Sequence, residues 1–253
     1  MPNKLKQLWA EGKPAINGWL AIPSGFSAEV MGQAGFDSVT VDLQHGVQDY
    51  LSMVQCFQGM QGQPVLPMVR VPWNEPGIIG KVLDAGAYGL ICPMINTKDE
   101  AARLVSYMRY PPKGARSNGP IRAGIYGAST GYQSTANDEI LCMPMIETQQ
   151  AIDGIDAILD VEGIDAIYIG PSDLAFSKGL TPALDREEPE ILKIYEVLLE
   201  KAAKQGVRAG VHTLKPDYAA RMLKMGFNLV TLGNDSGLML GAARAAVAGA
   251  RAK

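Results

Sequence analysis

Cysteine is scarce in this sequence. The three thiols, at Cys56, Cys92 and Cys142, lie far apart, and each has apolar neighbours. No pair has the short spacing of a zinc or redox motif, and three widely separated cysteines do not make a disulfide framework. Because free cysteine behaves as a small apolar residue, we expect all three side chains to be buried structural groups.

Charge and long apolar runs are also scarce. Charged residues make up 19% of the chain, the formal net charge is -3, and no cluster of Lys and Arg occurs. This pattern argues against binding to nucleic acid or to a membrane surface. No apolar stretch reaches the roughly 20 residues that span a bilayer, and the polar residues 1–13 lack the apolar core of a signal peptide. We therefore expect a cytoplasmic protein with no nucleic-acid or membrane partner, whose ligands are small molecules.

Apolar residues are abundant and occur in short runs. They make up 47% of the 253 residues, and α/β barrels reach this length as one domain, so we expect a single domain over residues 1–253. Runs rich in β-branched residues alternate with segments of helical period. The expected strands span residues 15–22, 38–43, 65–71, 89–94, 140–146, 166–169, 207–211 and 229–232. The expected helices span residues 50–60, 77–85, 99–108, 151–161, 189–204, 217–225 and 236–252.

Eight strands that alternate with helices predict an α/β fold, a (β/α)₈ TIM barrel, with an open doubly wound sheet as the lesser alternative. Catalytic side chains of such barrels lie at the carboxyl ends of the strands. Glu147 follows the fifth expected strand and Asp173 follows the sixth, so their carboxylates are expected at the same rim. Two carboxylates and several waters suit Mg²⁺ or Mn²⁺. The alternative is that both are solvated loop acids.

Two further kinds of polar residue follow the expected strands. Arg70 lies in the otherwise apolar run 65–71, so its guanidinium requires an anionic ligand or, alternatively, a structural ion pair with an acid such as Asp42. His45 and His212 are the two histidines of the chain, and both lie at strand ends. A neutral imidazole can accept a proton near pH 7, which makes each a candidate base, with a structural role as the alternative for each.

Lysine is absent from all eight expected strands. An enzyme that forms a Schiff base with its substrate would therefore lack its nucleophile, which leaves the metal as the candidate electrophile. The glycine-rich segment 110–138 is long for a connection and carries Arg116 and Arg122. Long loops are uncommon and often functional, so the segment is expected either to fold over an anionic ligand or to pack on the barrel or a neighbouring subunit.

Six segments of the chain match motifs of a known family. They are residues 36–45, 69–72, 82–94, 110–119, 145–147 and 162–174. The last of these, EGIDAIYIGPSDL, is specific when a Glu ends the preceding strand, whereas the Arg-Val-Pro and Tyr-Pro-Pro pieces are supportive. Over nearly its whole length the chain resembles the HpcH/HpaI aldolases, which include 4-hydroxy-2-oxoheptanedioate and 2-keto-3-deoxy-sugar-acid aldolases.

The resemblance implies a class II pyruvate aldolase with a barrel of the phosphoenolpyruvate/pyruvate-domain type. Such an enzyme cleaves 4-hydroxy-2-oxo acids reversibly to pyruvate, or hydroxypyruvate, and an aldehyde, with Mg²⁺, Mn²⁺ or Co²⁺ as cofactor. By the resemblance, Glu147 and Asp173 hold the metal. His45 is the base, Arg70 steadies the enolate, and the backbone around Ser172 and Asp173 receives the substrate carboxylate.

The resemblance also implies a carboxylate that makes the histidine more basic, and the matching position is Asp84. This residue ends the expected helix 77–85, which in a barrel lies at the end opposite the active site. We therefore expect Asp84 to act across a subunit interface. The implied assembly is a homohexamer built as a trimer of dimers, or another homo-oligomer, with the C-terminal helix 236–252 exchanged between subunits.

The chain departs from the family pattern at Met145, where several relatives carry a Gln that contacts the oxo acid. Residues two apart on a strand share a face, so a thioether is expected beside Glu147, and we expect looser discrimination between donors such as pyruvate and hydroxypyruvate. Two other functions stay open. One is a lyase of the citrate lyase β type that acts on coenzyme A thioesters, and the other is a non-catalytic ligand-binding barrel.

Overall fold

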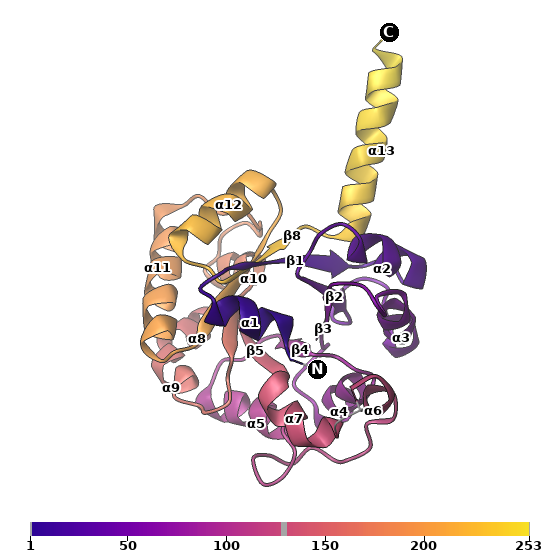
Figure 1. Cartoon of the computed structure of the whole chain (residues 1–253). Helices are drawn as coiled ribbons and strands as arrows, with labels where there is room; N and C mark the ends of the chain where they lie inside the picture. Colours follow the sequence, from indigo (N-terminus) through magenta and orange to yellow (C-terminus); the bar gives the residue numbers. More distant parts are fainter. Residues whose placement is uncertain (1, 128–130, 253) are drawn as a thin grey trace.

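The computed structural model describes residues 2–127 and 131–252 and has the predicted architecture. Eight parallel strands pair in sequence order and close into a barrel surrounded by helices (Figure 1). The strands are β1 Ala15–Leu20, β2 Ser38–Asp42, β3 Leu66–Arg70, β4 Gly89–Cys92, β5 Leu141–Ile146, β6 Ala166–Ile169, β7 Arg208–Thr213 and β8 Leu229–Leu232. The closed sheet confirms the TIM barrel and excludes the open doubly wound alternative.

The helices follow the strands in the order that the periodicity predicts. They are α1 Lys4–Ala10, α2 Gly25–Gly32, α3 Tyr50–Gly59, α4 Pro76–Asp84, α5 Lys98–Met108, α6 Ile121–Gly127, α7 Tyr132–Glu139, α8 Gln149–Asp153, α9 Ile155–Leu159, α10 Pro171–Ser177, α11 Pro189–Lys204, α12 Pro216–Met225 and α13 Asp235–Arg251. The expected helix 151–161 is two short helices, because the chain breaks at Gly154. Five helices were not predicted from the sequence: α1, α2, α6, α7 and α10. None of the helices described is long and apolar enough to cross a membrane.

Strand periodicity divides the core into two layers. In β2, Val39 and Val41 are buried against the surrounding helices, whereas Ser38 and Thr40 are buried among polar groups inside the barrel. This alternation follows from the period of two in a strand. The helices thus cover one face of the sheet with apolar side chains, while the barrel interior can carry polar groups. The three cysteines are buried and unpaired, as predicted.

The segment 110–138 is an ordered excursion over its described residues, which include α6 and part of α7. Arg116 donates to the Asp84 carboxylate, with 2.8 Å between Nη2 and Oδ1. Arg122 donates to the carbonyl oxygen of Ala85 at 2.6 Å. Both arginines therefore hold the segment against the end of α4 in the same chain, which favours packing on the barrel over closure on a ligand in this chain's own site. Residues 128–130 lie outside the described residues.

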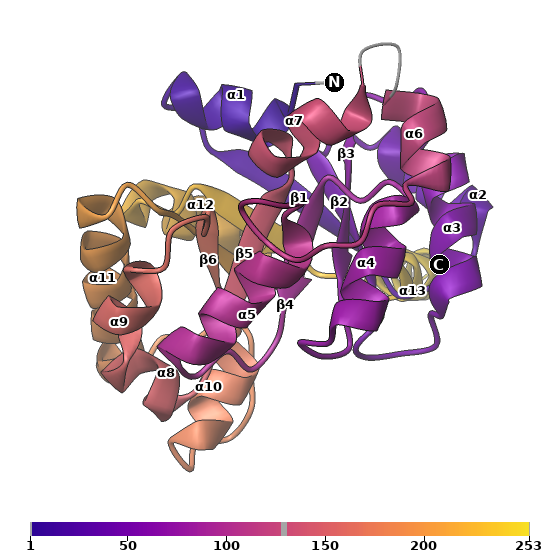
Figure 2. The ribbon, with the colours of Figure 1, turned by 90° about the horizontal axis from the view of Figure 1, so that it is seen from below.

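Helix α1 lies beside α7 at the amino-terminal end of the barrel (Figures 1 and 2). Its Asn3 cap donates to the carbonyl oxygens of Tyr88, directly before β4, and of Glu139, the last residue of α7. Leu5 is fully buried in the cluster that fills the barrel interior. Lys6 pairs with Asp165 at 2.6 Å. The helix therefore closes this end of the barrel.

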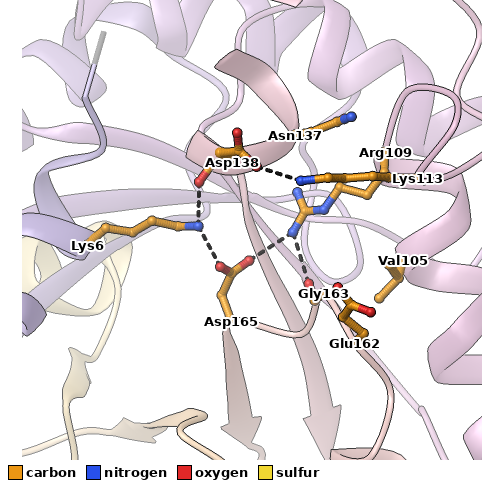
Figure 3. Close-up of a pocket in the computed structure, with 9 residues that line it drawn as sticks. All are labelled: Lys6, Val105, Arg109, Lys113, Asn137, Asp138, Glu162, Gly163 and Asp165. Atoms are coloured by element: carbon orange, nitrogen blue, oxygen red, sulfur yellow. Dashed lines mark hydrogen bonds and ion pairs between the residues drawn. The ribbon is translucent and has the colours of Figure 1, made fainter. Parts of the chain in front are cut away.

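A cavity of about 430 Å³ lies beside α1 (Figure 3). Its cations are each paired with an acid: Asp165 accepts from both Lys6 and Arg109, and Asp138 accepts from Lys113. Arg109 is buried and donates also to the carbonyl oxygens of Ile140 and Gly163. Because these charges neutralise one another, we assign the side chains around the cavity a structural role. Their ion pairs connect the helices to the ends of the strands.

We expect Leu5→Ala to lower the free energy of unfolding by about 3 kcal/mol, because the truncation leaves a cavity in the closed end of the barrel. Urea denaturation followed by circular dichroism measures the change. Gln7→Ala is the matched control, since Gln7 is exposed on the same helix and its loss should change stability by less than about 0.5 kcal/mol. Equal stability of the two variants would show that α1 does not close the core.

Candidate active site

A cavity of about 390 Å³ opens at the carboxyl end of the barrel. Its lining comes from the carboxyl ends of seven strands, all but β4, and from the segments that follow them. The lining residues are Trp19, Asp42, His45, Arg70, Met145, Glu147, Gly170, Pro171, Ser172, Asp173, Leu184, His212 and Asn234. The structure thus gathers every predicted site residue except Asp84 around one cavity.

Glu147 follows β5 directly and is 2% exposed. Its Oε1 accepts the N–H of Met94 at 2.8 Å. Met94 has a φ of 56°, an uncommon left-handed conformation for a residue with a side chain. Burial raises the pKa of Glu147 to about 7; the Met94 hydrogen bond opposes this rise and the negative charge of Asp173 adds to it. A bound cation would offset the cost of burying one carboxylate next to another.

Asp173 lies in the first turn of α10, which begins with Pro171. The N–H groups in the first turn of a helix have no acceptor within the helix. The amides of Ser172 and Asp173 are therefore available at the edge of the cavity, where the partial positive charge of the helix terminus favours an anion.

The residues present suit a hard divalent cation. Among the described residues, no three side chains of His, Cys, Asp or Glu come together in a possible metal site. The protein would therefore supply the two carboxylates of Glu147 and Asp173 and leave the other positions to water and substrate oxygens, as is common for Mg²⁺.

Gly170 explains part of the IGPSDL motif. A Cβ at this position would lie 2.3 Å from Oε2 of Glu147 and 2.9 Å from Cε of Met145. Only glycine therefore lets the chain pass beside the carboxylate without displacing it. Met145 is 3% exposed and lines the same cavity.

Arg70 and Asp42 form a two-pronged ion pair across β2 and β3. Nε of Arg70 lies 2.8 Å from Oδ1 of Asp42, and Nη2 lies 2.6 Å from Oδ2. Burial opposes ionisation of Asp42, but the hydrogen bonds and charge of Arg70 outweigh it and lower the pKa of the carboxyl group. The ion pair considered as the alternative for Arg70 is therefore present. Because Arg70 also lines the cavity, the pair orients the guanidinium there and leaves Nη1 for a ligand.

Trp19 is a part of the site that the sequence analysis missed. Its indole N–H donates to Oδ2 of Asp42 at 3.2 Å, and the guanidinium of Arg70 lies 4.8 Å from the ring centroid. The ring of His212 meets Trp19 edge-on, with 4.7 Å between ring centroids. The tryptophan thus packs between the ion pair and the histidine. Its place in an expected strand was visible in the sequence, but its neighbours depend on barrel closure.

The two histidines differ in their surroundings. His45 is exposed in the loop after β2, where its backbone N–H donates to Asp42 at 3.4 Å. Its imidazole has no hydrogen-bond partner among the described residues. His212 points inward from β7, and its Nδ1 lies 3.1 Å from the hydroxyl of Tyr168. Burial, reinforced by the positive charge of Arg70, lowers the pKa of His212 to about 3.

Asp84 ends α4 and is not among the residues that line the cavity. Its Oδ1 accepts from Arg116, whose guanidinium packs over the rings of Tyr110 and Tyr132 at 4.4 and 5.6 Å. The Asp84 side chain remains 28% exposed. The residue therefore presents a fixed carboxylate to the surface rather than to the site of its own chain.

Comparison with known proteins gives consistent results. Residues 18–242 match the family described as HpcH/HpaI aldolase/citrate lyase. The chain is 39% identical over 99% of both chains to a hydroxypyruvate/pyruvate aldolase of Rhizorhabdus wittichii. It is 35% identical to a 5-keto-4-deoxy-D-glucarate aldolase of Escherichia coli, over 94% of this chain and 92% of that protein. A crystal structure of a family member from Burkholderia cenocepacia superposes with a TM-score of 0.91 at 30% identity, over 98% of this chain and 99% of the other. This chain belongs to the HpcH/HpaI aldolase/citrate lyase family.

Proposed function

We propose that the protein is a divalent-metal-dependent aldolase that reversibly cleaves 4-hydroxy-2-oxo acids to pyruvate, or hydroxypyruvate, and an aldehyde. The observation that carries the proposal is the pair Glu147 and Asp173 at the edge of one cavity, beside an oriented Arg70. The aldolase names of relatives at 35% and 39% identity support it over a coenzyme A thioester lyase.

Each residue of the cavity has a part in the proposed reaction. Glu147 and Asp173 hold a cation, Mg²⁺, Mn²⁺ or Co²⁺, which when bound supplies Lewis-acid polarisation of the 2-oxo group. The amides of Ser172 and Asp173 receive the substrate carboxylate. In the direction of addition, His45 removes a proton from C3 and then protonates the new alkoxide at C4; in cleavage it takes the C4 hydroxyl proton, and after the C3–C4 bond breaks it returns a proton to C3. Arg70 stabilises the negative charge that develops on the oxo oxygen.

Met145 bears on the choice of donor. Its thioether lies beside Glu147, where several relatives have an amide that contacts the oxo acid, and it offers no strong hydrogen bond to the ligand. We infer that the donor position tolerates a hydroxyl at C3, so that both pyruvate and hydroxypyruvate are accepted. The name of the relative from Rhizorhabdus wittichii supports this inference.

A homo-oligomer completes the proposed site. Helix α13 projects away from the barrel (Figure 1), and its apolar side chains Leu238, Met239, Leu240 and Val247 are about half exposed or more. At the amino-terminal end of α13, Leu238 and Met239 line an apolar groove together with residues of α2. We propose that a second copy of the chain covers this surface by exchange of α13, as in a hexamer, and that assembly brings Asp84 to His45 of another subunit.

Metal dependence is the first test. EDTA should abolish cleavage in a panel of 4-hydroxy-2-oxo acids, and Mg²⁺, Mn²⁺ or Co²⁺ should restore it, because no strand contains a lysine to replace the cation. Pyruvate release measures turnover, and malyl-type thioesters in the same panel test the lyase alternative through acetyl-CoA release. Glu147→Ala should lose turnover but keep binding oxo acid weakly. Full activity in EDTA, or in Glu147→Ala, would refute the proposal.

Gly170→Ala should weaken metal binding by at least about tenfold, because the new methyl group displaces the Glu147 carboxylate. Titration calorimetry with Mn²⁺ measures the affinity without any need for turnover. Gly77→Ala is the control, since a Cβ there meets no atom within 4 Å. Unchanged affinity in Gly170→Ala would mean that Glu147 is not a ligand.

The interface is tested by two variants. Met239→Glu should dissociate the assembly, which light scattering detects as a fall towards the 27.1 kDa of one chain. Asp84→Asn should keep the assembled mass but move the acidic limb of the pH profile of kcat/KM to lower pH, because His45 loses a negative neighbour. An unchanged profile would refute the role of Asp84, and an unchanged mass in Met239→Glu would refute the interface.

A further inference from the structure

A line of buried polar side chains crosses the barrel interior and ends at the candidate active site. The hydroxyls of Ser38 and Thr40 donate to Oδ1 of Asn17 at 2.8 and 3.0 Å. Two hydroxyl donors on one oxygen set the orientation of the amide, so its Nδ2 faces Thr231 and donates to Oγ1 at 2.9 Å. All four residues are fully buried.

The orientation of Asn17 sets the direction of the next two hydrogen bonds. Thr231 accepts from Asn17, and Tyr168 lies 2.6 Å from the same Oγ1. If the Tyr168 hydroxyl donated to Thr231, the threonine proton would have no acceptor among the residues described. Thr231 therefore donates to Tyr168, and Tyr168 donates to Nδ1 of His212 at 3.1 Å. The remaining proton of a neutral His212 is then on Nε2.

The environment keeps Tyr168 and His212 in these protonation states. Burial raises the pKa of the Tyr168 phenol, so the hydroxyl keeps the proton that it donates. Burial and Arg70 lower the pKa of His212 to about 3, so its ring stays neutral at physiological pH. The edge-on contact with Trp19 limits rotation of the ring. His212 lines the cavity, and because Nδ1 is held by Tyr168, its uncharged Nε2–H is the donor left for a ligand there.

We propose that Nε2–H of His212 donates a hydrogen bond to a substrate hydroxyl outside the oxo-acid chelate, and so makes the enzyme prefer hydroxylated substrates. The inference rests on the proposed aldolase function. The polar groups around it suit other parts of the complex: Glu147 and Asp173 would hold the cation, and Arg70 suits an anionic oxygen. An uncharged donor suits a neutral oxygen. A substrate that lacks this hydroxyl leaves the N–H without its partner, which costs transition-state stabilisation.

The hydroxyl can belong to either substrate, and paired substrates of equal size distinguish the two sources. Glycolaldehyde against propanal, with pyruvate as donor, reports a hydroxyl on the aldehyde. Hydroxypyruvate against 2-oxobutanoate, with one fixed aldehyde, reports a hydroxyl on the donor. We expect the native protein to favour the hydroxylated member of at least one pair. In His212→Phe, that ratio of kcat/KM should fall by about tenfold or more, because the N–H donor is lost while an aromatic ring is kept.

His212→Gln is the matched variant, because its side-chain amide restores an N–H donor at similar reach. It should recover most of the ratio that His212→Phe loses. Tyr168→Phe removes the group that positions His212, so the ratio should fall partway while turnover of the unhydroxylated substrate is kept. Ratios equal to those of the native protein in His212→Phe, or an equal loss for both members of each pair, would overturn the proposal.

The protonation state of His212 is tested without turnover. The chain has two histidines, so magic-angle-spinning NMR of ¹⁵N-histidine protein gives two imidazoles, and His212→Gln assigns them. We expect His212 as the neutral Nε2–H form from pH 5 to 8, and a mixture of forms in Tyr168→Phe. An Nδ1–H form would overturn the inference. If the spectra agree but no oxo acid is cleaved, the proposed function fails; cleavage with unchanged ratios refutes the role of His212 alone.

Discussion

The pairing of Asp42 with Arg70 holds the rest of the site in place. The two residues are register partners on β2 and β3, so the parallel sheet itself brings their side chains together. Asp42 also accepts hydrogen bonds from the indole N–H of Trp19 and from the backbone N–H of His45. Removal of either charge would leave the other buried without its opposite charge, which costs more than the loss of one neutral hydrogen bond. The loop that carries His45, the Arg70 guanidinium and the Trp19 ring therefore depend on one ion pair.

Much of this arrangement could be predicted from the sequence. Eight apolar runs were enough for the barrel, and the rule that chemistry lies at the carboxyl ends of strands was enough to group Glu147 with Asp173. The family resemblance added roles for His45 and Arg70. Helices α2 and α7 were missed because their apolar residues do not gather on one face, and α6 and α10 because they are only seven residues long. Helix α1 was overlooked even though Leu5 and Trp9, four residues apart, mark its buried face.

The inner polar line could not have been predicted in the same way. Asn17, Thr231 and Tyr168 lie on β1, β8 and β6, and in the sequence they look like isolated polar residues within apolar strands. They meet because β1 pairs with β8, with Asn17 opposite Thr231, when the barrel closes. Strand seven also runs to Thr213 rather than ending at residue 211, so His212 is a strand residue that faces inward. Long-range register, rather than local pattern, decides which polar groups face one another.

Helix α13 has a consequence for how the protein folds. Asp235 is its one buried residue in the single chain, so little tertiary packing stabilises the 17 residues from Asp235 to Arg251. An isolated helix of this length is marginal in water, even with favourable residues. In the assembly proposed above, a second copy of the chain would stabilise this helix, so the helical content of the C-terminus would rise with protein concentration and the measured stability would depend on that concentration.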